Sequence, residues 1–181
     1  LLEKGADDTR LDLLYSSAAG LLERVKYLLE EERAPLEVTN NDGCTALMLA
    51  VKNGKLDVVE YLLEKGADIE AKDIGDRTPL MHGVIYNQLE IVDHLLKKGA
   101  NSKARSSRGY STFMWCVVNQ NYRLIEYLLT RGFDLEEKDD YGNTALVKAV
   151  NEGKTELFKF ILSLGADIEA RNNIGRTAFL S

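Results

Sequence analysis

The sequence predicts an all-α solenoid with short β-hairpin turns, built from about five stacked helix–turn–helix units. The first observation is a fixed period, because a threonine or serine recurs every 33 residues, at Thr45, Thr78, Ser111, Thr144 and Thr177. The second is that each lies in a similar string, such as "DGCTALMLAVKNG" or "YGNTALVKAVNEG". The third is a composition that is 45% hydrophobic with two prolines, which suits a long continuous core. A solenoid presents an extended concave face instead of one deep pocket.

One period shows the expected elements in order: a turn (40–44), a short helix (45–53), a second helix (56–65) and an extended tail (67–72). Thr45 has the hydroxyl that caps a helix start, and Pro79 in the next period stands where a missing N–H costs little. Gly54 and Gly66 supply the left-handed conformation that ends each helix. Helices this short are below the roughly 12–15 residues at which an isolated helix becomes marginally stable, so each depends on its neighbours.

These strings carry a resemblance to a known family. The runs "DGCTALMLAVKNGKLDVVEYLLEKGADIEAKD", "DRTPLMHGVIYNQLEIVDHLLKKGANSKAR" and "YGNTALVKAVNEGKTELFKFILSLGADIEAR" resemble the ankyrin repeat family in the order of their elements. The resemblance implies a single array over 1–181, with full repeats at 40–72, 73–105, 106–138 and 139–171. A degenerate amino-terminal unit at 1–39 and a truncated repeat at 172–181 complete it.

The amino-terminal string "LLEKGAD" is identical to Leu62–Asp68, so it looks like the end of a further repeat. From Gly5 to Leu13 is eight residues, whereas from Gly66 to Leu80 is fourteen. Either the first hairpin is short by six residues, or a stretch is missing between Gly5 and Leu13. A truncated unit at each end leads us to expect a fragment of a longer protein, since complete arrays carry capping repeats.

The charge of the chain limits its partners. The net charge is −6, and no basic stripe is present, which argues against nucleic acid or an anionic membrane as the partner. No apolar run is long enough to span a bilayer, and no signal-peptide pattern opens the chain. Cys44 and Cys116 lie two repeats apart, too distant for a disulfide, so we expect reduced thiols, which suit a cytoplasmic location. We also expect a monomer.

Two columns of charge recur at the repeat spacing. The acidic column is Glu37, Glu70, Lys103, Glu136 and Glu169, and the basic column is Thr39, Lys72, Arg105, Lys138 and Arg171. We expect the two to lie side by side and to compensate each other at a solvated surface. A third column is Met48, Met81, Met114 and Val147. Its three methionines fit either a groove or packing between layers, and packing is the commoner role.

Nothing in the pattern predicts an enzyme, a cofactor or a metal site. The only histidines, His82 and His94, lie in different helices without nearby cysteine partners, whereas zinc sites need three or four converging ligands. The paired acids Asp139–Asp140 fall in a hairpin, where a solvated turn is the simpler interpretation. Ser16–Ser17 forms no plausible nucleophile arrangement with either histidine.

Ankyrin-like proteins usually hold partners at the hairpin tips and the exposed end of the first helix. Carried over by position, the resemblance implies partner-binding roles for Asp42, Lys52, Arg77, Tyr86, Arg108, Tyr110, Trp115, Asn119, Asp140, Tyr141 and Asn143. Tyrosine, tryptophan and arginine are typical of binding hot spots, although Tyr141 and Trp115 also fit packing between layers. The repeats at 73–105 and 106–138 depart from the pattern at Asn87 and Gln120, which replace the helix-ending glycine.

The expected function is therefore a non-catalytic module that binds another protein or peptide on its concave face. The alternative is a targeting or scaffold segment of a larger protein whose catalytic or effector domain lies outside this chain. A plain structural spacer and a host-directed effector also remain open.

Overall fold

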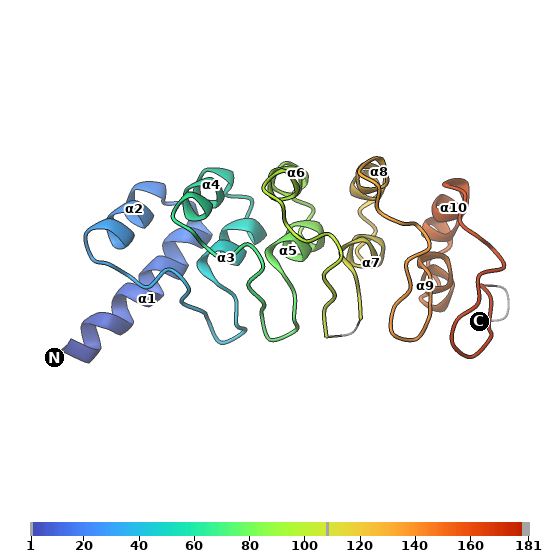
Figure 1. Ribbon diagram of the computed structural model, residues 1–181, viewed down its shortest axis with the longest axis horizontal. Helices are drawn as coiled ribbons and strands as arrows, with labels where there is room; N and C mark the ends of the chain where they lie inside the picture. The colour runs from blue at the N-terminus through green and yellow to red at the C-terminus, as the bar shows by residue number, and fades with distance from the viewer. Residues whose placement is uncertain (1, 108, 179–181) are drawn as a thin grey trace. The chain divides into compact units, whose positions relative to one another are not determined.

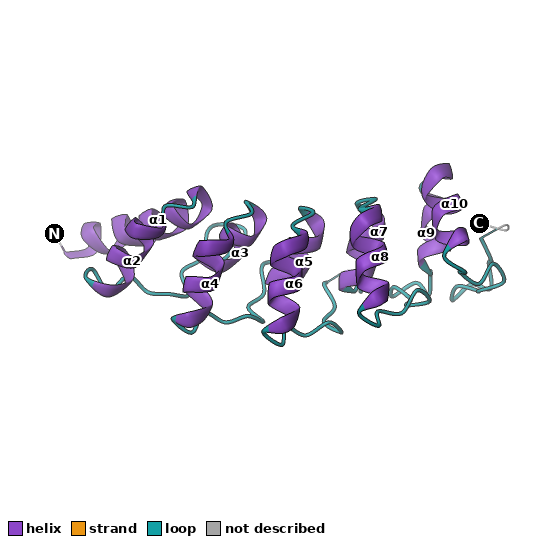
Figure 2. Cartoon of the chain, turned by 90° about the horizontal axis from the view of Figure 1, so that it is seen from above, coloured by secondary structure: helices purple, strands orange, loops and turns teal. Residues whose placement is uncertain are grey.

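The computed structural model describes residues 2–107 and 109–178, with side chains from Thr9 onward. This part of the chain is all-α, as predicted, and contains ten helices in five consecutive pairs. Figure 2 shows the helices and the loops that join them. The chain divides into two compact units, Leu1–Asn101 and Ser102–Ser181, and we describe each by itself.

The amino-terminal unit holds three helix pairs: α1 (Leu2–Ala19) with α2 (Leu22–Glu30), α3 (Ala46–Lys52) with α4 (Leu56–Glu64), and α5 (Pro79–Ile85) with α6 (Leu89–Lys97). Helices α1, α3 and α5 form an inner row, and α2, α4 and α6 form an outer row (Figure 1). The hairpin loops project from the inner row, on the side away from the outer row. The core between the rows is apolar, with Leu47, Leu62 and Leu95 almost completely buried.

The carboxy-terminal unit repeats this arrangement with two pairs: α7 (Thr112–Val118) with α8 (Tyr122–Thr130), and α9 (Ala145–Asn151) with α10 (Thr155–Ser163). The inner helices α7 and α9 pack on each other and on their own outer helices. Between the outer helices, Tyr122 meets Phe160 edge-to-face at 4.8 Å between ring centroids. Each inner helix therefore depends on neighbours in two directions.

Hydroxyl caps begin the inner helices α3, α5, α7 and α9, as the period predicted. The side-chain oxygens of Thr45, Thr78 and Ser111 accept the backbone N–H three residues on, at 3.3, 3.4 and 3.2 Å. The capping residues are buried, so the oxygens also satisfy donors that water does not reach. The methionine column is buried with 0% exposure at Met48 and Met114, which confirms that it packs between layers.

Left-handed residues separate the two helices of a repeat. Gly54 and Gly153 have φ of 71° and 66° there, and the substitutes Asn87 and Gln120 adopt the same conformation with φ of 56° and 57°. The backbone path is therefore kept where glycine is lost. An L-residue carries a steric cost in this region, and the cost is smaller for asparagine than for glutamine.

The start of the chain differs from the expectation. We expected Leu1–Asp7 to end a further repeat with a hairpin after it, but the backbone from Leu2 to Ala19 is one continuous helix, α1. The same seven letters at Leu62–Asp68 end helix α4 and turn at Gly66. Tertiary packing, not the local string, decides between these two conformations.

The two charge columns also differ from the expectation. We expected them to compensate each other, but the glutamates instead accept backbone N–H groups in the following repeat. These bonds are Glu37 Oε1 with Asp68 N (2.9 Å), Glu70 Oε1 with Asn101 N (2.6 Å) and Glu136 Oε1 with Asp167 N (2.8 Å). In the basic column, Arg105 donates to the Lys138 carbonyl and Lys138 donates to the Arg171 carbonyl. Both columns thus tie a side chain to the backbone of the next repeat.

Candidate functional site

An asparagine or aspartate at the first position shapes the hairpin loops that begin at residues 40, 73, 139 and 172, whereas the loop before α7 begins with Ser106. In the loop before α5, Asp73 Oδ1 accepts the backbone N–H groups of Gly75 (2.8 Å) and Arg77 (2.9 Å). Asp139 makes the same two bonds in the loop before α9, to Tyr141 and Asn143, both at 2.9 Å. These closed turns hold the side chains at the loop tips in fixed positions.

In the amino-terminal unit, Lys52 and Tyr86 come together at the ends of α3 and α5. The Lys52 ammonium lies 4.9 Å from the centre of the Tyr86 ring, and Tyr86 is 40% exposed. The other neighbour of this ring is His82, which lies parallel to it with the ring centroids 6.2 Å apart. Asp42 is exposed in the preceding hairpin loop. The predicted contact residues Asp42, Lys52 and Tyr86 are therefore accessible to solvent. Tyr86 and Lys52 together form a surface that is both aromatic and cationic.

Arg77 is less available than the sequence implied. Its side chain is half-buried, and its Nε donates to Asp73 Oδ2 at 2.7 Å. Burial alone would raise the pKa of Asp73, but the backbone donors of Arg77 and Gly75 together with the guanidinium outweigh it and lower that pKa. The predicted contact residue Arg77 is thus bound to Asp73 in its own loop and does not extend freely toward a partner.

In the carboxy-terminal unit, Tyr110, Trp115 and Lys148 form what we call the aromatic cluster. The two rings meet edge-to-face at 5.2 Å, and the Lys148 ammonium lies 4.7 Å from the centre of the Tyr110 ring. The indole N–H of Trp115 donates to Ser106 Oγ at 3.3 Å. Both residues are half-buried, so each packs in the repeat and is still partly exposed to solvent. Next to them, the exposed Asn119 donates its amide to the Trp115 carbonyl at 2.8 Å.

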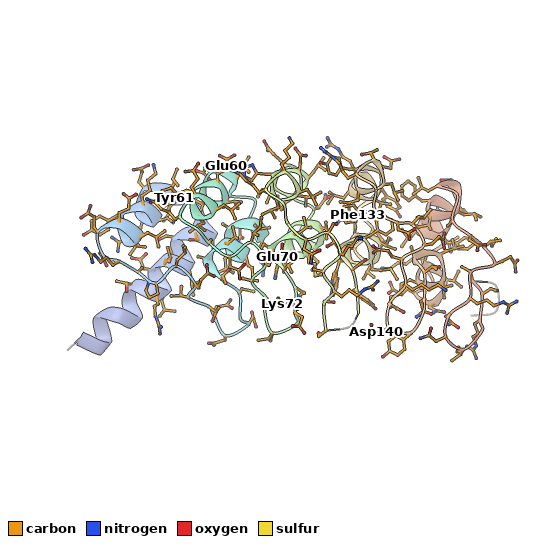
Figure 3. All side chains as sticks on the ribbon, in the orientation of Figure 1. Glu60, Tyr61, Glu70, Lys72, Phe133 and Asp140 are labelled. Atoms are coloured by element: carbon orange, nitrogen blue, oxygen red, sulfur yellow. The ribbon has the colours of Figure 1, made fainter. Side chains whose placement is uncertain are left out.

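A cavity of about 290 Å³ lies between the loop that precedes α9 and the loop that follows α10. We call it the asparagine cavity, and its lining residues are Asp140, Tyr141, Asn143, Asn151, Asn172, Asn173, Ile174 and Arg176. Three of them, Asp140, Tyr141 and Asn143, are among the residues predicted to contact a partner. Figure 3 shows Asp140 at the tip of its loop. The structure therefore brings these three together.

The residues that line the asparagine cavity differ in their exposure and in their hydrogen bonds. Tyr141 is 72% exposed, so of its two predicted roles it does not have the packing one. Asn143 is buried, and its amide joins Asp139 (3.2 Å) to Asn172 (3.0 Å). Asn143 thus forms a fixed wall of the cavity, and Tyr141 forms an open rim.

Sequence reasoning missed several residues of these surfaces. Lys148 stands one repeat after Trp115, and Asn172 to Arg176 stand one repeat after Asp139 to Asn143. Comparison of equivalent repeat positions was the signal that could have found them. Arg108, also predicted to contact a partner, lies outside the described residues.

Cys44, Asp73 and His82 form a buried group that we call the Cys44 cluster. One donor atom from each residue lies within 4.8 Å of the others, and His82 Nε2 is 3.0 Å from Asp73 Oδ2. The prediction that His82 has no nearby cysteine is therefore wrong. Cys44 is distant from His82 in sequence, but the fold brings it beside His82 from the preceding repeat. Burial and the neighbouring Asp73 raise the pKa of the Cys44 thiol, whereas burial lowers the pKa of His82.

The remaining candidates for chemistry have structural partners, except Ser17, whose buried hydroxyl has no hydrogen-bond partner within the part of the chain that the structure describes. Asp139 is buried and accepts backbone N–H groups, and Asp140 is exposed. This acidic pair therefore forms part of the hairpin turn. Ser16 donates to Asp12 at 2.9 Å on the same helix. Both cysteines, Cys44 and Cys116, are free thiols and buried. Among the helices described, each is too short or too polar to cross a membrane.

Comparison with known proteins finds short matches in long proteins of different kinds. Over 64 residues the chain is 38% identical to ankyrin repeat and SAM domain-containing protein 6 of Danio rerio, covering 35% of this chain and 9% of that protein. Over 64 residues it is also 38% identical to alpha-latroinsectotoxin-Lt1a of Latrodectus tredecimguttatus, covering 35% of this chain and 4% of the toxin. Over 53 residues it is 40% identical to NAD-capped RNA hydrolase NUDT12 of Macaca fascicularis, covering 29% of this chain and 12% of that enzyme.

The chain therefore spans between 4% and 12% of the length of these relatives. The model of ankyrin repeats in three copies matches residues 13–106 and again residues 80–172. These two matches overlap and cover most of the sequence. Ankyrin repeats are generally protein-binding modules and typically non-catalytic, and this chain belongs to the ankyrin repeat family.

Proposed function

We propose that the chain is a non-catalytic module that binds a partner protein or peptide at its hairpin loops and inner helices. The observation that carries the proposal is the asparagine cavity with Tyr141 standing open at its rim. A tyrosine that is 72% exposed has a large surface for a partner to cover, and tyrosine is a frequent hot-spot residue. The cavity and the aromatic cluster belong to the same unit, so one ligand of modest length has two anchoring places there.

The chemistry of the asparagine cavity favours a peptide with an apolar side chain beside an acidic one. Tyr141 and Ile174, 72% and 73% exposed, offer apolar surface at the cavity. Asn151 and Arg176 add an exposed amide and an exposed guanidinium, which bind a peptide carbonyl and a carboxylate. The exposed Asp140 at the same cavity disfavours a ligand that is acidic throughout.

A peptide-display selection tests the proposal even though the partner is unidentified. Peptides would be selected on the wild-type chain, and their dissociation constants measured with the wild type and with Tyr141→Ala. We expect at least about a tenfold loss of affinity in the variant, because truncation of a hot-spot tyrosine costs about 2 kcal/mol or more and tenfold corresponds to about 1.4 kcal/mol.

Tyr15→Ala is the matched control, since Tyr15 is 70% exposed on α1, far from the cavity in sequence. Its affinity should equal that of the wild type. Equal affinity in all three proteins would show that the selected peptides bind elsewhere, and the site would be wrong. Selection of no peptide at all would count against the binding module itself.

The second candidate is a targeting or scaffold segment of a larger protein. It is favoured by the relatives, whose matched stretches are at most 12% of their own lengths. In that case the chain would position a catalytic or effector domain that lies elsewhere. Fusion of the chain to a reporter enzyme distinguishes the two, because a targeting segment changes where the reporter accumulates and a Tyr141→Ala variant should abolish the change.

We also propose that the module acts as a monomer in the cytoplasm. Two buried free thiols suit a reducing compartment, and the net charge of −6 disfavours both nucleic acid and anionic lipid as the principal partner. Sedimentation of the purified chain gives the oligomeric state, and a mass twice that of the monomer would contradict this proposal.

A further inference from the structure

The Cys44 cluster has the composition of a transition-metal site. We propose that Cys44, Asp73 and His82 bind one zinc ion, with water as the fourth ligand. The site would lie between two successive repeats, because Cys44 ends one hairpin loop and Asp73 and His82 belong to the next repeat. This inference is independent of the asparagine cavity and of any protein partner.

The geometry needs only small movements. The three donor atoms already lie within 4.8 Å of one another, and His82 Nε2 is 3.0 Å from Asp73 Oδ2. Zinc bonds of about 2.0–2.3 Å in a tetrahedron place the donors about 3.3–3.7 Å apart, so shifts on the order of 1 Å suffice. Side-chain rotation supplies shifts of this size without a change in the backbone.

The burial of the three side chains favours a site of defined structure. Asp73 and His82 are 5% and 2% exposed, and Cys44 is 6% exposed. His82 Nε2 is the ring nitrogen that lies beside Asp73 Oδ2, so a metal bound through this nitrogen replaces a hydrogen bond between two groups that are already adjacent. A thiolate, an imidazole and a carboxylate together select zinc over magnesium or calcium, which prefer oxygen ligands.

Arg77 is the group that competes with the metal. Its Nε donates to Asp73 Oδ2 at 2.7 Å, so the guanidinium now supplies the positive charge that a zinc ion would supply. The side chain is 31% exposed and is able to turn toward water when the ion enters. Binding then exchanges one counter-charge for another: the Cys44 thiol gives its proton to solvent as the sulfur–zinc bond forms, and Arg77 leaves Asp73.

Cobalt(II) is a suitable probe because a tetrahedral cobalt–thiolate site absorbs strongly in the near ultraviolet and visible ranges. The reduced wild-type chain, freed of metal with a chelator and then dialysed, would be titrated with cobalt and afterwards with zinc. We expect one cobalt per chain, a charge-transfer band, and loss of that band when one equivalent of zinc is added. A wild-type chain that shows no such band overturns the proposal.

The chain offers a matched control for two of the ligands, since it has two cysteines and two histidines, with one of each in the cluster. Cys44→Ser and His82→Gln should lose the band and weaken zinc binding by more than the roughly 10–100-fold that follows removal of an outer-shell partner. Cys116→Ser and His94→Gln should keep both. A band that survives Cys44→Ser, or that disappears with Cys116→Ser, also overturns the proposal.

Arg77→Gln is expected to strengthen zinc binding, whereas the ligand variants weaken it. A variant that merely unfolds cannot produce stronger binding. Removal of the competing guanidinium should tighten zinc binding by at least about tenfold, because the ion then no longer has to break the charged hydrogen bond between Arg77 and Asp73. Circular dichroism confirms that each variant is folded. Weaker binding in a folded Arg77→Gln chain would contradict the assignment of the site.

Discussion

At the scale of single residues, the position between the two helices of a repeat imposes a left-handed backbone whatever side chain stands there. Gly54, Gly153, Asn87 and Gln120 all adopt it. Glycine has no Cβ to clash, asparagine is tolerated, and glutamine has neither advantage. The array therefore stores a small amount of strain at Gln120, in one of the two repeats that lose the glycine at this position.

We predict that Gln120→Gly stabilises the protein. Relief of the left-handed strain contributes about 1–2 kcal/mol, and the greater freedom of glycine in the unfolded chain offsets about 0.5–1 kcal/mol of it. The expected net gain in the free energy of unfolding is about 0.5–1 kcal/mol, measured by urea denaturation. Asn87→Gly should gain less.

Gly54→Ala is the reverse control for this prediction. It introduces a Cβ at φ of 71°, with the Gln88 side-chain oxygen 2.8 Å away, and it should destabilise the protein by about 1 kcal/mol or more. A Gln120→Gly variant that is less stable than the wild type would show that the glutamine side chain contributes more than its backbone costs.

At the scale of helices and loops, the acidic column connects one repeat to the next. Glu70→Ala removes the acceptor for the Asn101 backbone N–H, and we expect a loss of about 1 kcal/mol in the free energy of unfolding, the typical net contribution of a hydrogen bond. Glu70→Gln keeps an acceptor oxygen and should lose less. Glu169→Ala makes the same change of charge at an exposed position of the same column. If it costs as much as Glu70→Ala, the effect is one of charge and not of the bond.

The contact between α1 and α2 is predicted to depend on pH. Arg24 Nε donates to Asp12 Oδ2 at 2.9 Å, and this hydrogen bond, with a second from Ser16, lowers the pKa of Asp12 below its usual 3.8. The folded chain therefore resists protonation of Asp12 more than the unfolded chain does. The stability that the contact provides is complete above pH 3.8 and is lost as the pH falls through the lowered pKa.

Asp12→Asn tests this pH dependence. At pH 7 the variant should be less stable than the wild type by about 0.5–1 kcal/mol, as for a half-exposed ion pair with good geometry. The difference in stability should shrink as the pH falls below 3.8 and through the lowered pKa of Asp12, because the wild-type carboxyl then also becomes uncharged. A difference that stays constant with pH would mean that the asparagine disturbs packing instead of charge.

At the scale of the whole molecule, local chemistry explains what could be predicted from the sequence and what could not. The caps at Thr45 and Thr78 and the turn at Gly54 depend on residues within four positions, so the repeat pattern was enough. The conformation of α1 was missed because an identical string, Leu62–Asp68, ends a helix elsewhere.

Contacts between repeats needed the three-dimensional register. The repeat pattern does not show that His82 meets Cys44, and it places Lys148 one repeat after Trp115 without showing that Lys148 covers the ring of Tyr110. Each of these contacts joins different repeats, and the residues at equivalent positions in other repeats are of other types. Predicted contact residues on exposed loop tips, such as Tyr141, are found where the repeat spacing puts them, and Arg77 is not free because its partner Asp73 lies in the same turn.

The net charge leads to a prediction about association of whole molecules. The chain has a net charge of −6 and a pI near 5.1, so its mutual repulsion vanishes at that pH. We expect light scattering by concentrated protein to be greatest near pH 5.1 and to fall on either side. Glu64→Lys, at an exposed position of α4, removes one acid and adds one base and should move the maximum to higher pH. Glu64→Asp keeps the charge and should leave it in place. If the maximum does not move with Glu64→Lys, attraction between local patches, and not the loss of overall repulsion, brings the molecules together.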